Sequence, residues 1–112
     1  AFGENVKVIE WSERSSALAS CGLLVNTTSL GMTGQPALDI VLEDLPGSAV
    51  VYDIVYSPLE TPLLAAARAQ GNQGVDGLGM LLHQATPGFE AWFGVKPVVD
   101  VTLRDFILAD LT

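Results

Sequence analysis

The residues best suited to chemistry lie in the stretch 76–85, where Met80 and Gln84 follow the glycines Gly77 and Gly79. Met80 and Gln84 are four residues apart, so a helix places both side chains on one face. The glycines allow the backbone to approach a ligand closely. A thioether and an amide beside a glycine turn suit a small polar ligand next to a planar ring. A glycine-capped core helix with an incidental glutamine explains the same residues, because an isolated glycine pair is a weak signal.

Two other stretches place short polar side chains directly after an apolar run. Residues 26–32 read Asn-Thr-Thr-Ser-Leu-Gly-Met and follow the apolar residues 23–25, while residues 53–64 follow a second run at 49–52. If both runs are parallel strands, their polar ends meet at the sheet edge where ligands bind. Polar side chains in such loops also bond their own backbone, which is the structural alternative.

The hydrophobic pattern predicts alternating strands and helices. We expect strands at residues 6–9, 23–25, 49–53 and 73–75, the last being a brief edge strand. We expect helices at 13–20, at 62–70, from Gly77 onward, and from Asp100 or Thr102 to Leu111, with a short helical turn near 38–42. Thr61 is the expected cap of the second helix, with Pro62 at its first position. This alternation is typical of a doubly wound α/β sheet.

Pro87 interrupts the helix that carries Gln84. Proline lacks the backbone N–H, and its ring clashes with the preceding turn. We therefore expect a kink or a restart at this point, which would change where Phe89 and Trp92 point. The single histidine, His83, lies roughly a quarter-turn from Gln84 on a helix, and we expect it to be structural or exposed.

The charge balance narrows the classes of partner. The net charge is −8, from 13 acidic and 5 basic residues, which argues against nucleic acid and anionic membranes. No basic residue lies in the three polar stretches, so little side-chain charge is available there to hold phosphates; the basic residues are Lys7, Arg14, Arg68, Lys96 and Arg104. No apolar run is long enough to span a membrane. The lone Cys21 excludes an internal disulfide and permits a reducing compartment, so we expect a cytoplasmic protein. We expect no metal site.

Taken in order, the three polar stretches closely resemble the C-terminal half of shikimate dehydrogenases. The family patterns read N-A-T-S-x-G-M, D-x-x-Y-x-P-x-x-T-x-L-L and D-G-x-x-M-L-x-x-Q-A, and the likeness runs from about Gly22 to the end of the chain. The resemblance implies a partial Rossmann-like doubly wound parallel sheet, comprising strands three to six, with terminal helices over 77–112. Residues 1–112 would then be the C-terminal part of a dinucleotide-binding domain, without the N-terminal substrate domain and the glycine-rich phosphate loop.

The resemblance also implies roles for individual residues. Tyr56 and Gln84 would bind the substrate, since their positions face it in the family and an amide can both donate to and accept from a hydroxyl group. Cofactor contacts would come from the residues that line the cleft in the family: Asn26, Thr27, Thr28, Ser29, Ile54, Gly77 and Met80. Thr27 stands where the family usually has alanine, so it adds a hydroxyl group.

The activity implied by the resemblance is reversible hydride transfer between 3-dehydroshikimate and NADPH, in aromatic amino acid biosynthesis. In the family, a Lys/Asp pair of the substrate domain handles the proton. No lysine lies in the motifs of this chain, so we expect no catalytic residue here and no activity of the chain alone. Two alternatives stay open: a quinate/shikimate dehydrogenase that uses NAD, and a non-catalytic binding or interaction module. The residues that select NADP or NAD would precede Ala1.

A sheet without its first two strands has an unpaired central edge. In this fold strand 23–25 normally lies beside the absent first strand, and free edges recruit other strands. We therefore expect one of two arrangements. Either strand 6–9 pairs with strand 23–25, or a second copy of the chain covers the edge.

Overall fold

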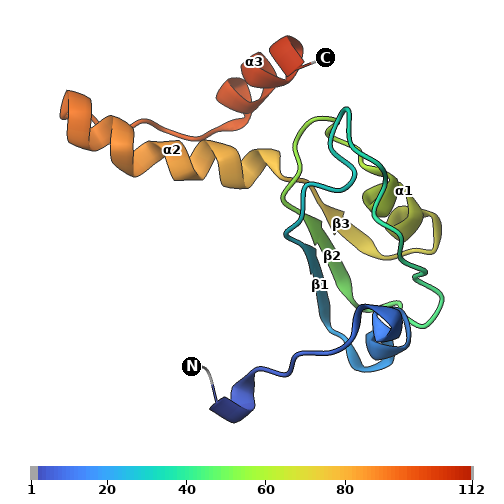
Figure 1. The fold of residues 1–112 in the computed structure, drawn as a ribbon. Helices are drawn as coiled ribbons and strands as arrows, with labels where there is room; N and C mark the ends of the chain where they lie inside the picture. Colours follow the sequence, from blue (N-terminus) through green and yellow to red (C-terminus); the bar gives the residue numbers. More distant parts are fainter. Residues whose placement is uncertain (1–2, 112) are drawn as a thin grey trace.

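The computed structural model describes residues 3–111 and shows a small α/β unit from which two helices project (Figure 1). The sheet and α1 form the compact part, and α2 leads away from it before α3 turns back. In chain order the elements are η1 Gly3–Asn5, η2 Trp11–Glu13, η3 Ser16–Ser20, β1 Leu23–Asn26, β2 Val50–Asp53, α1 Pro62–Ala69, β3 Gln73–Val75, α2 Leu78–Phe93 and α3 Val101–Leu111, where η denotes a 3-10 helix.

The sheet is parallel throughout, with the strand order β1-β2-β3. Leu24 of β1 lies beside Val51 of β2, which in turn lies beside Gly74 of β3. The central strand is therefore β2, and its Val51 is fully buried. This arrangement confirms the predicted α/β class, including the brief edge strand at 73–75. It also brings the carboxyl ends of β1 and β2 to the same edge of the sheet.

The hydrophobic core lies between the sheet and α1. Leu64 and Ala67 of α1 are fully buried together with Val51 of β2. As predicted, α1 begins at Pro62, because the side chain of Thr61 accepts a hydrogen bond from the N–H of Leu64 at 3.3 Å.

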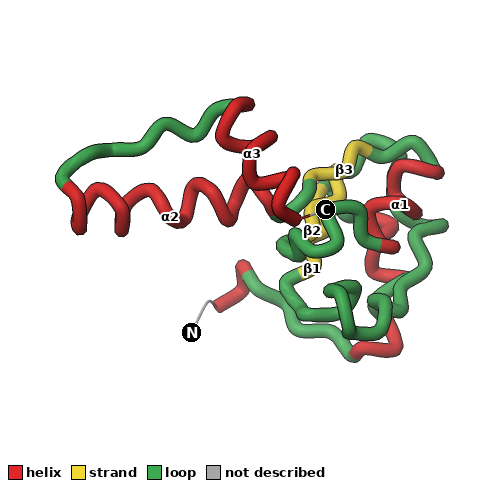
Figure 2. Tube along the Cα trace, turned by 90° about the horizontal axis from the view of Figure 1, so that it is seen from above, coloured by secondary structure: helices red, strands yellow, loops and turns green. Residues whose placement is uncertain are grey.

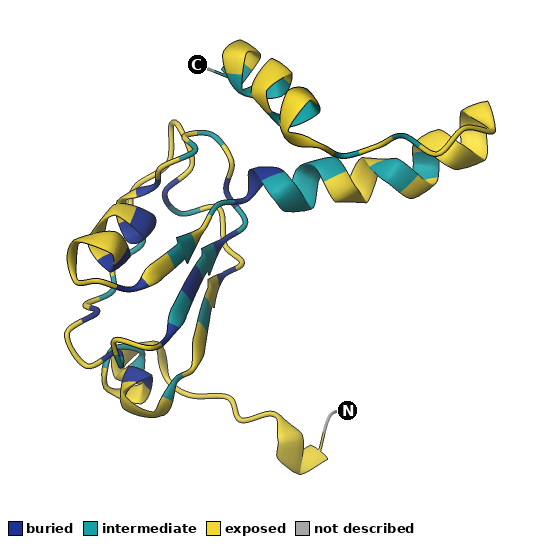
Figure 3. Cartoon of the chain, turned by 180° about the vertical axis from the view of Figure 1, so that it is seen from behind, coloured by how far each residue is buried: buried dark blue, intermediate teal, exposed yellow. Residues whose placement is uncertain are grey.

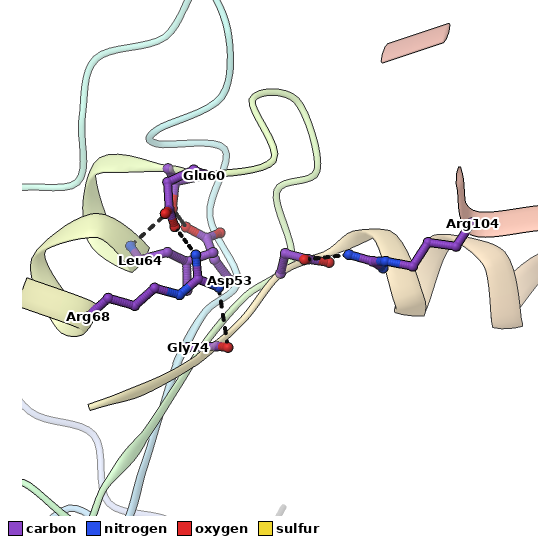
Figure 4. Close-up of polar contacts among 8 residues, drawn as sticks. Asp53, Glu60, Leu64, Arg68, Gly74 and Arg104 are labelled. Atoms are coloured by element: carbon purple, nitrogen blue, oxygen red, sulfur yellow. Dashed lines mark hydrogen bonds and ion pairs between the residues drawn. The ribbon is translucent and has the colours of Figure 1, made fainter. Parts of the chain in front are cut away.

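The exposed side of α1 is attached to β3 through Arg68. Its guanidinium forms an ion pair with Glu60 and donates a 3.4 Å hydrogen bond to the carbonyl of Gly74 (Figure 4). Both partners of the ion pair are exposed, so this contact orients the side chains and contributes little stability.

One buried carboxylate, that of Asp53, joins the ends of β1 and β2 to the start of α1. Its Oδ2 accepts a hydrogen bond from the hydroxyl of Thr61 at 2.7 Å. Its Oδ1 accepts from the N–H of Val55 at 3.0 Å and from the amide of Asn26 at 3.2 Å. Among residues 3–111, no buried polar side-chain atom lacks a partner. Because a buried carboxylate is costly without hydrogen bonds, the three segments stabilise one another.

The segment before β1 differs from the prediction. Residues 6–10 are exposed and form no strand, with Val8 91% accessible (Figure 3). The predicted strand 6–9 is therefore wrong, and so is its pairing with 23–25, because the sheet places no neighbour beside this segment. The predicted helix 13–20 is replaced by the short turns η2 and η3, in which only Leu18 is buried. No helical turn forms at 38–42.

The helix α2 runs from Leu78 to Phe93 without a break at Pro87 (Figure 2). The expected restart is wrong. Proline removes one helical hydrogen bond, and the carbonyl left without its donor belongs to the exposed residue His83, where water can bond it. The helix ends at Gly94, whose left-handed conformation (φ 71°) lets its N–H donate to the carbonyl of Glu90 at 2.8 Å.

The last helix, α3, begins at Val101, close to where it was predicted. The side chain of Asp100 caps it by accepting a hydrogen bond from the N–H of Leu103 at 2.9 Å. Leu103 and Ile107 are partly covered on one side of the helix, whereas Phe106 is exposed. No helix within the described part of the chain is long and apolar enough to cross a membrane.

Replacing Thr61 by alanine would remove both the cap of α1 and one hydrogen bond to Asp53. An N-cap is worth about 1 kcal/mol, and a buried acceptor that loses its donor costs about 1–3 kcal/mol. We expect Thr61→Ala to lower the free energy of unfolding by roughly 2–3 kcal/mol in urea titrations followed by circular dichroism. The control is Thr102→Ala on the exposed first turn of α3. This variant should change the free energy of unfolding by less than about 0.5 kcal/mol. Equal effects of the two variants would contradict the role given to Asp53.

Candidate functional site

A hollow of about 310 Å³ opens where the ends of β1 and β2 meet the start of α2. Three segments supply its walls: the loop after β1, the loop after β2 and the first turn of α2. The lining residues are Thr27, Thr28, Ser29, Met32, Ile54, Val55, Tyr56 and Met80. The hollow therefore gathers most of the predicted site residues, although they come from three separate stretches of sequence.

Hydrogen bonds of Asn26 and Thr28 give the loop after β1 a fixed shape. The Oδ1 of Asn26 accepts from both the N–H and the hydroxyl of Thr28, at 3.0 and 2.7 Å. Thr28 Oγ1 then accepts from the N–H of Leu30 at 3.1 Å, while the Asn26 amide donates to the carbonyl of Leu30 at 3.0 Å. These two side chains thus adopt the structural alternative, in which polar groups bond their own loop.

Gly77 determines how closely α2 approaches the end of β2. A Cβ atom at this position would overlap the carbonyl of Ile54 and lie 2.7 Å from the carbonyl oxygen of Val55. Close packing within the protein therefore requires a glycine here, and the contact of its backbone with a ligand stays a prediction. Gly79 differs, because a Cβ atom there would have nothing within 4 Å.

Asp76 fixes the first turn of α2 and attaches α3 to it. Its Oδ1 accepts from the N–H of Leu78 at 3.1 Å, and its Oδ2 pairs with Arg104 Nη2 of α3 at 2.6 Å (Figure 4). Both side chains of this pair are largely shielded from solvent. The turn that carries Met80 is thus held by the sheet on one side and by α3 on the other.

Three predicted site residues do not line the hollow. Asn26 is buried within the hydrogen bonds of its loop, and Gly77 is buried against Ile54. Gln84 is exposed one helical turn beyond Met80, and its side chain makes no hydrogen bond to any of residues 3–111. The hollow also contains Val55, which the sequence reasoning missed, since a buried valine after a strand carries no chemical signal.

The lining suits a planar ring with hydrogen-bonding groups at its edge. Met32, Met80, Ile54 and Val55 form apolar walls, and the hydroxyl groups of Thr27, Ser29 and Tyr56 lie among them. No lysine or arginine lines this hollow within the described chain. The nicotinamide and ribose of a dinucleotide fit such a lining, whereas its phosphates find no side-chain cation in it.

The parallel strands, with polar loops at their carboxyl ends next to the start of a helix, place the chain in the Rossmann-like α/β class. Residues 77–104 match the C-terminal domain of shikimate 5′-dehydrogenases. Over 108 residues the chain is 62% identical to the shikimate dehydrogenase (NADP(+)) of Paramagnetospirillum magneticum, a match that covers 96% of this chain. The chain is homologous to the C-terminal part of shikimate dehydrogenases, as the sequence motifs indicated.

Solved structures show the same relationship. The Thermus thermophilus shikimate 5-dehydrogenase, in complex with NADP(H) and shikimate, has a TM-score of 0.69 at 30% identity, over 84% of this chain and 34% of that one. The quinate dehydrogenase of Corynebacterium glutamicum, in complex with NAD, has a TM-score of 0.73 at 36% identity, over 85% of this chain and 33% of that one. The chain spans 39% of the length of the Paramagnetospirillum relative.

Gly77 and Gly79 provide a matched pair of substitutions. Gly77→Ala forces α2 away from the backbone of Ile54 and should lower the free energy of unfolding by roughly 1–3 kcal/mol. Gly79→Ala meets open space inside a helix and should raise it by about 0.5–1 kcal/mol. Urea denaturation of both variants checks the opposite signs. The same sign for both would contradict the close packing at Gly77.

Proposed function

We propose that the chain forms the nicotinamide-binding side of an NADP-dependent shikimate dehydrogenase, which reversibly reduces 3-dehydroshikimate to shikimate. The observation that carries this proposal is the hollow at the ends of β1 and β2, which gathers the residues of all three motifs. Relatives that are 62% and 64% identical to the chain have the name shikimate dehydrogenase (NADP(+)). NADP is therefore the proposed cofactor. NAD stays an alternative, since a similar structure named quinate dehydrogenase holds NAD.

In this proposal the walls of the hollow receive the nicotinamide ring. The Met80 side chain packs on the ring from α2, with Ile54 at the end of β2 on another wall. The loop after β1 presents hydroxyl groups to the ribose. Gly77 and Asn26 act through the backbone geometry that they impose, because neither lines the hollow.

The substrate lies beside the nicotinamide in this proposal, between Tyr56 and Gln84. The phenol of Tyr56 is partly exposed at the hollow, and Gln84 follows Met80 by four residues on α2. Neither side chain is hydrogen-bonded to another described residue, so both are free to bond the hydroxyl groups of a polyol.

Proton transfer requires a group from outside the hollow. When bound, the cofactor supplies or accepts the hydride, and the substrate oxygen must gain or lose a proton at the same time. Among the described residues, those that line the hollow include no histidine, lysine or carboxylate. This chain therefore binds and orients the reactants in our proposal, and the acid–base residue belongs to another part of the enzyme. We place the enzyme in the cytoplasm, which is consistent with the free thiol of Cys21.

Titrating the 15N-labelled chain with NADPH tests the site. We expect NMR shift changes at the amides of Thr27, Ser29, Tyr56 and Met80, and none in α1. Met80→Ala should weaken binding roughly fivefold, because about 1 kcal/mol of apolar contact is lost. NADH titrated in parallel compares the two cofactors.

Adenosine 2′,5′-bisphosphate is the matched control ligand for this titration, because it lacks the nicotinamide. It should leave the shifts of the hollow unchanged. Adding shikimate to the NADPH complex should then move the signals of Tyr56 and Gln84. Equal shifts with NADPH and the control ligand, or formation of NADPH from NADP and shikimate by the chain alone, would contradict the proposal.

The free edge of β1 is the proposed site of self-association. Carbonyls of Gly22 and Asn26 bond β2, at 3.1 Å to the N–H of Val50 and 3.2 Å to that of Ile54. By the alternation of a parallel ladder, the backbone groups of Val25 point away from β2. No strand within residues 3–111 covers this edge. A strand of a second copy can pair there.

Sedimentation at rising concentration tests this pairing. The chain should form dimers, and Leu23→Lys should prevent them, because a charge blunts an exposed strand edge. Leu23 and Val98 are both exposed, but Val98 lies far along the chain from β1, so Val98→Lys is the control. Dimers in Leu23→Lys, or a wild-type chain that stays monomeric at 11.8 kDa, would argue against edge pairing.

A further inference from the structure

Thr27 and Thr28 are neighbours of similar chemistry, but the structure gives their hydroxyl groups different surroundings. The hydroxyl of Thr28 donates to Asn26 Oδ1 at 2.7 Å and accepts from the N–H of Leu30 at 3.1 Å. Its donor is therefore used within the loop. The side chain of Thr27 is exposed and makes no hydrogen bond to any residue in the described part of the chain. Of the two threonines, Thr27 is thus the one whose hydroxyl has a donor and an acceptor available to a ligand.

Thr27 also lies where two hollows meet. The hollow at Met80 shares Thr27 and Thr28 with a second hollow of about 400 Å³, which runs along β1 towards Trp11 and Arg14. Ser29 also carries a hydroxyl that bonds no other residue between 3 and 111, but it lines the first hollow only. A ligand that extends from one hollow into the other must therefore pass Thr27.

The guanidinium of Arg14 in the second hollow is already engaged. It pairs with Asp39 at 2.9 Å and stacks over the ring of Trp11, with 4.6 Å from its central carbon to the ring centroid. Its N–H donors are therefore less available than a free hydroxyl to bind the hydroxyl groups of a ligand. At the junction of the two hollows, the group free to bond a sugar hydroxyl is Thr27 Oγ1.

From this difference we infer that Thr27 supplies the hydrogen bond to a ribose hydroxyl of the ligand, while Thr28 is a positioning residue that holds the loop. The inference rests on the proposed function, because it takes the ligand to be a nicotinamide nucleotide. It adds a division of labour between two adjacent hydroxyl groups. Thr27 acts on affinity for the ribose, and Thr28 acts on the shape of the loop through Asn26.

Valine substitutions separate the two roles, because valine keeps the size of threonine and removes the hydroxyl. Thr27→Val should weaken NADPH binding roughly three- to tenfold, the effect of one hydrogen bond, without changing the urea midpoint. Thr27→Ser keeps the hydroxyl and should restore most of the affinity. Thr28→Val should lower the urea midpoint, because it removes the hydroxyl that donates to Asn26 Oδ1 and accepts from the N–H of Leu30, and should weaken binding as a consequence. Thr102→Val, on exposed α3, controls for the change from threonine to valine.

The outcomes distinguish this inference from the function on which it rests. Absence of NADPH shifts in the wild-type chain would defeat the proposed function itself. NADPH binding that is equally tight in Thr27→Val and wild type would overturn the role of Thr27 alone. A Thr28→Val variant as stable as wild type, but with weaker binding, would contradict the positioning role of Thr28.

Discussion

The buried carboxylate of Asp53 is the constraint on which the rest of the structure depends. It accepts hydrogen bonds from Asn26, Val55 and Thr61, which belong to the end of β1, the loop after β2 and the cap of α1. A carboxylate buried in this way needs all of these donors, because the loss of any one leaves a buried oxygen with one hydrogen bond fewer and destabilises the fold. Asp53 therefore attaches the start of α1 to the sheet and also fixes the two loops that line the hollow. The same hydrogen bonds contribute to the stability of the fold and to the geometry of the candidate site.

The start of α2 completes the site by a different principle. Its position follows from two contacts that involve no ligand-facing group: the backbone contact of Gly77 with Ile54, and the ion pair of Asp76 with Arg104. Met80 then points into the hollow because of where its helix begins. The atoms that would touch a ligand thus differ from the atoms that position them, even within one residue: the backbone of Ile54 meets Gly77, while Ile54 also lines the hollow. Three short motifs, far apart in sequence, describe one hollow because the fold brings their segments together.

Much of this architecture could be predicted from sequence, because it follows from local signals. Strands β1 and β2 are short apolar runs, and α1 has its Thr61 cap and Pro62 at the first turn. The strand expected at 6–9 failed because a β-rich tetrapeptide needs a neighbouring strand, which a local pattern does not reveal. The restart considered at Pro87 did not occur, because the carbonyl that loses its donor belongs to the exposed residue His83, where water can bond it.

The candidate site shows the same limit. The motifs identified the residues around the hollow, but which hydroxyl groups are consumed inside the loop depends on hydrogen bonds that only the folded chain displays. Sequence also suggested that the backbone of Gly77 approaches a ligand, but it did not reveal that a side chain at this position would overlap the backbone of Ile54. The kinds of chemical group at the site could thus be predicted from the sequence, but which of them are free to bind a ligand could not.

The contact at Gly77 has a consequence for how such a site can change. Backbone atoms on both sides set the separation between α2 and the end of β2, so the width of the hollow does not depend on the side chains that line it. Residues such as Met80, Ile54 and Tyr56 can then be exchanged one at a time while the opposite walls keep their spacing. A scaffold of this kind allows ligand preference to drift through single substitutions, provided that position 77 stays glycine. Glycine at position 77 therefore preserves the spacing of the walls while the residues that line the hollow are substituted.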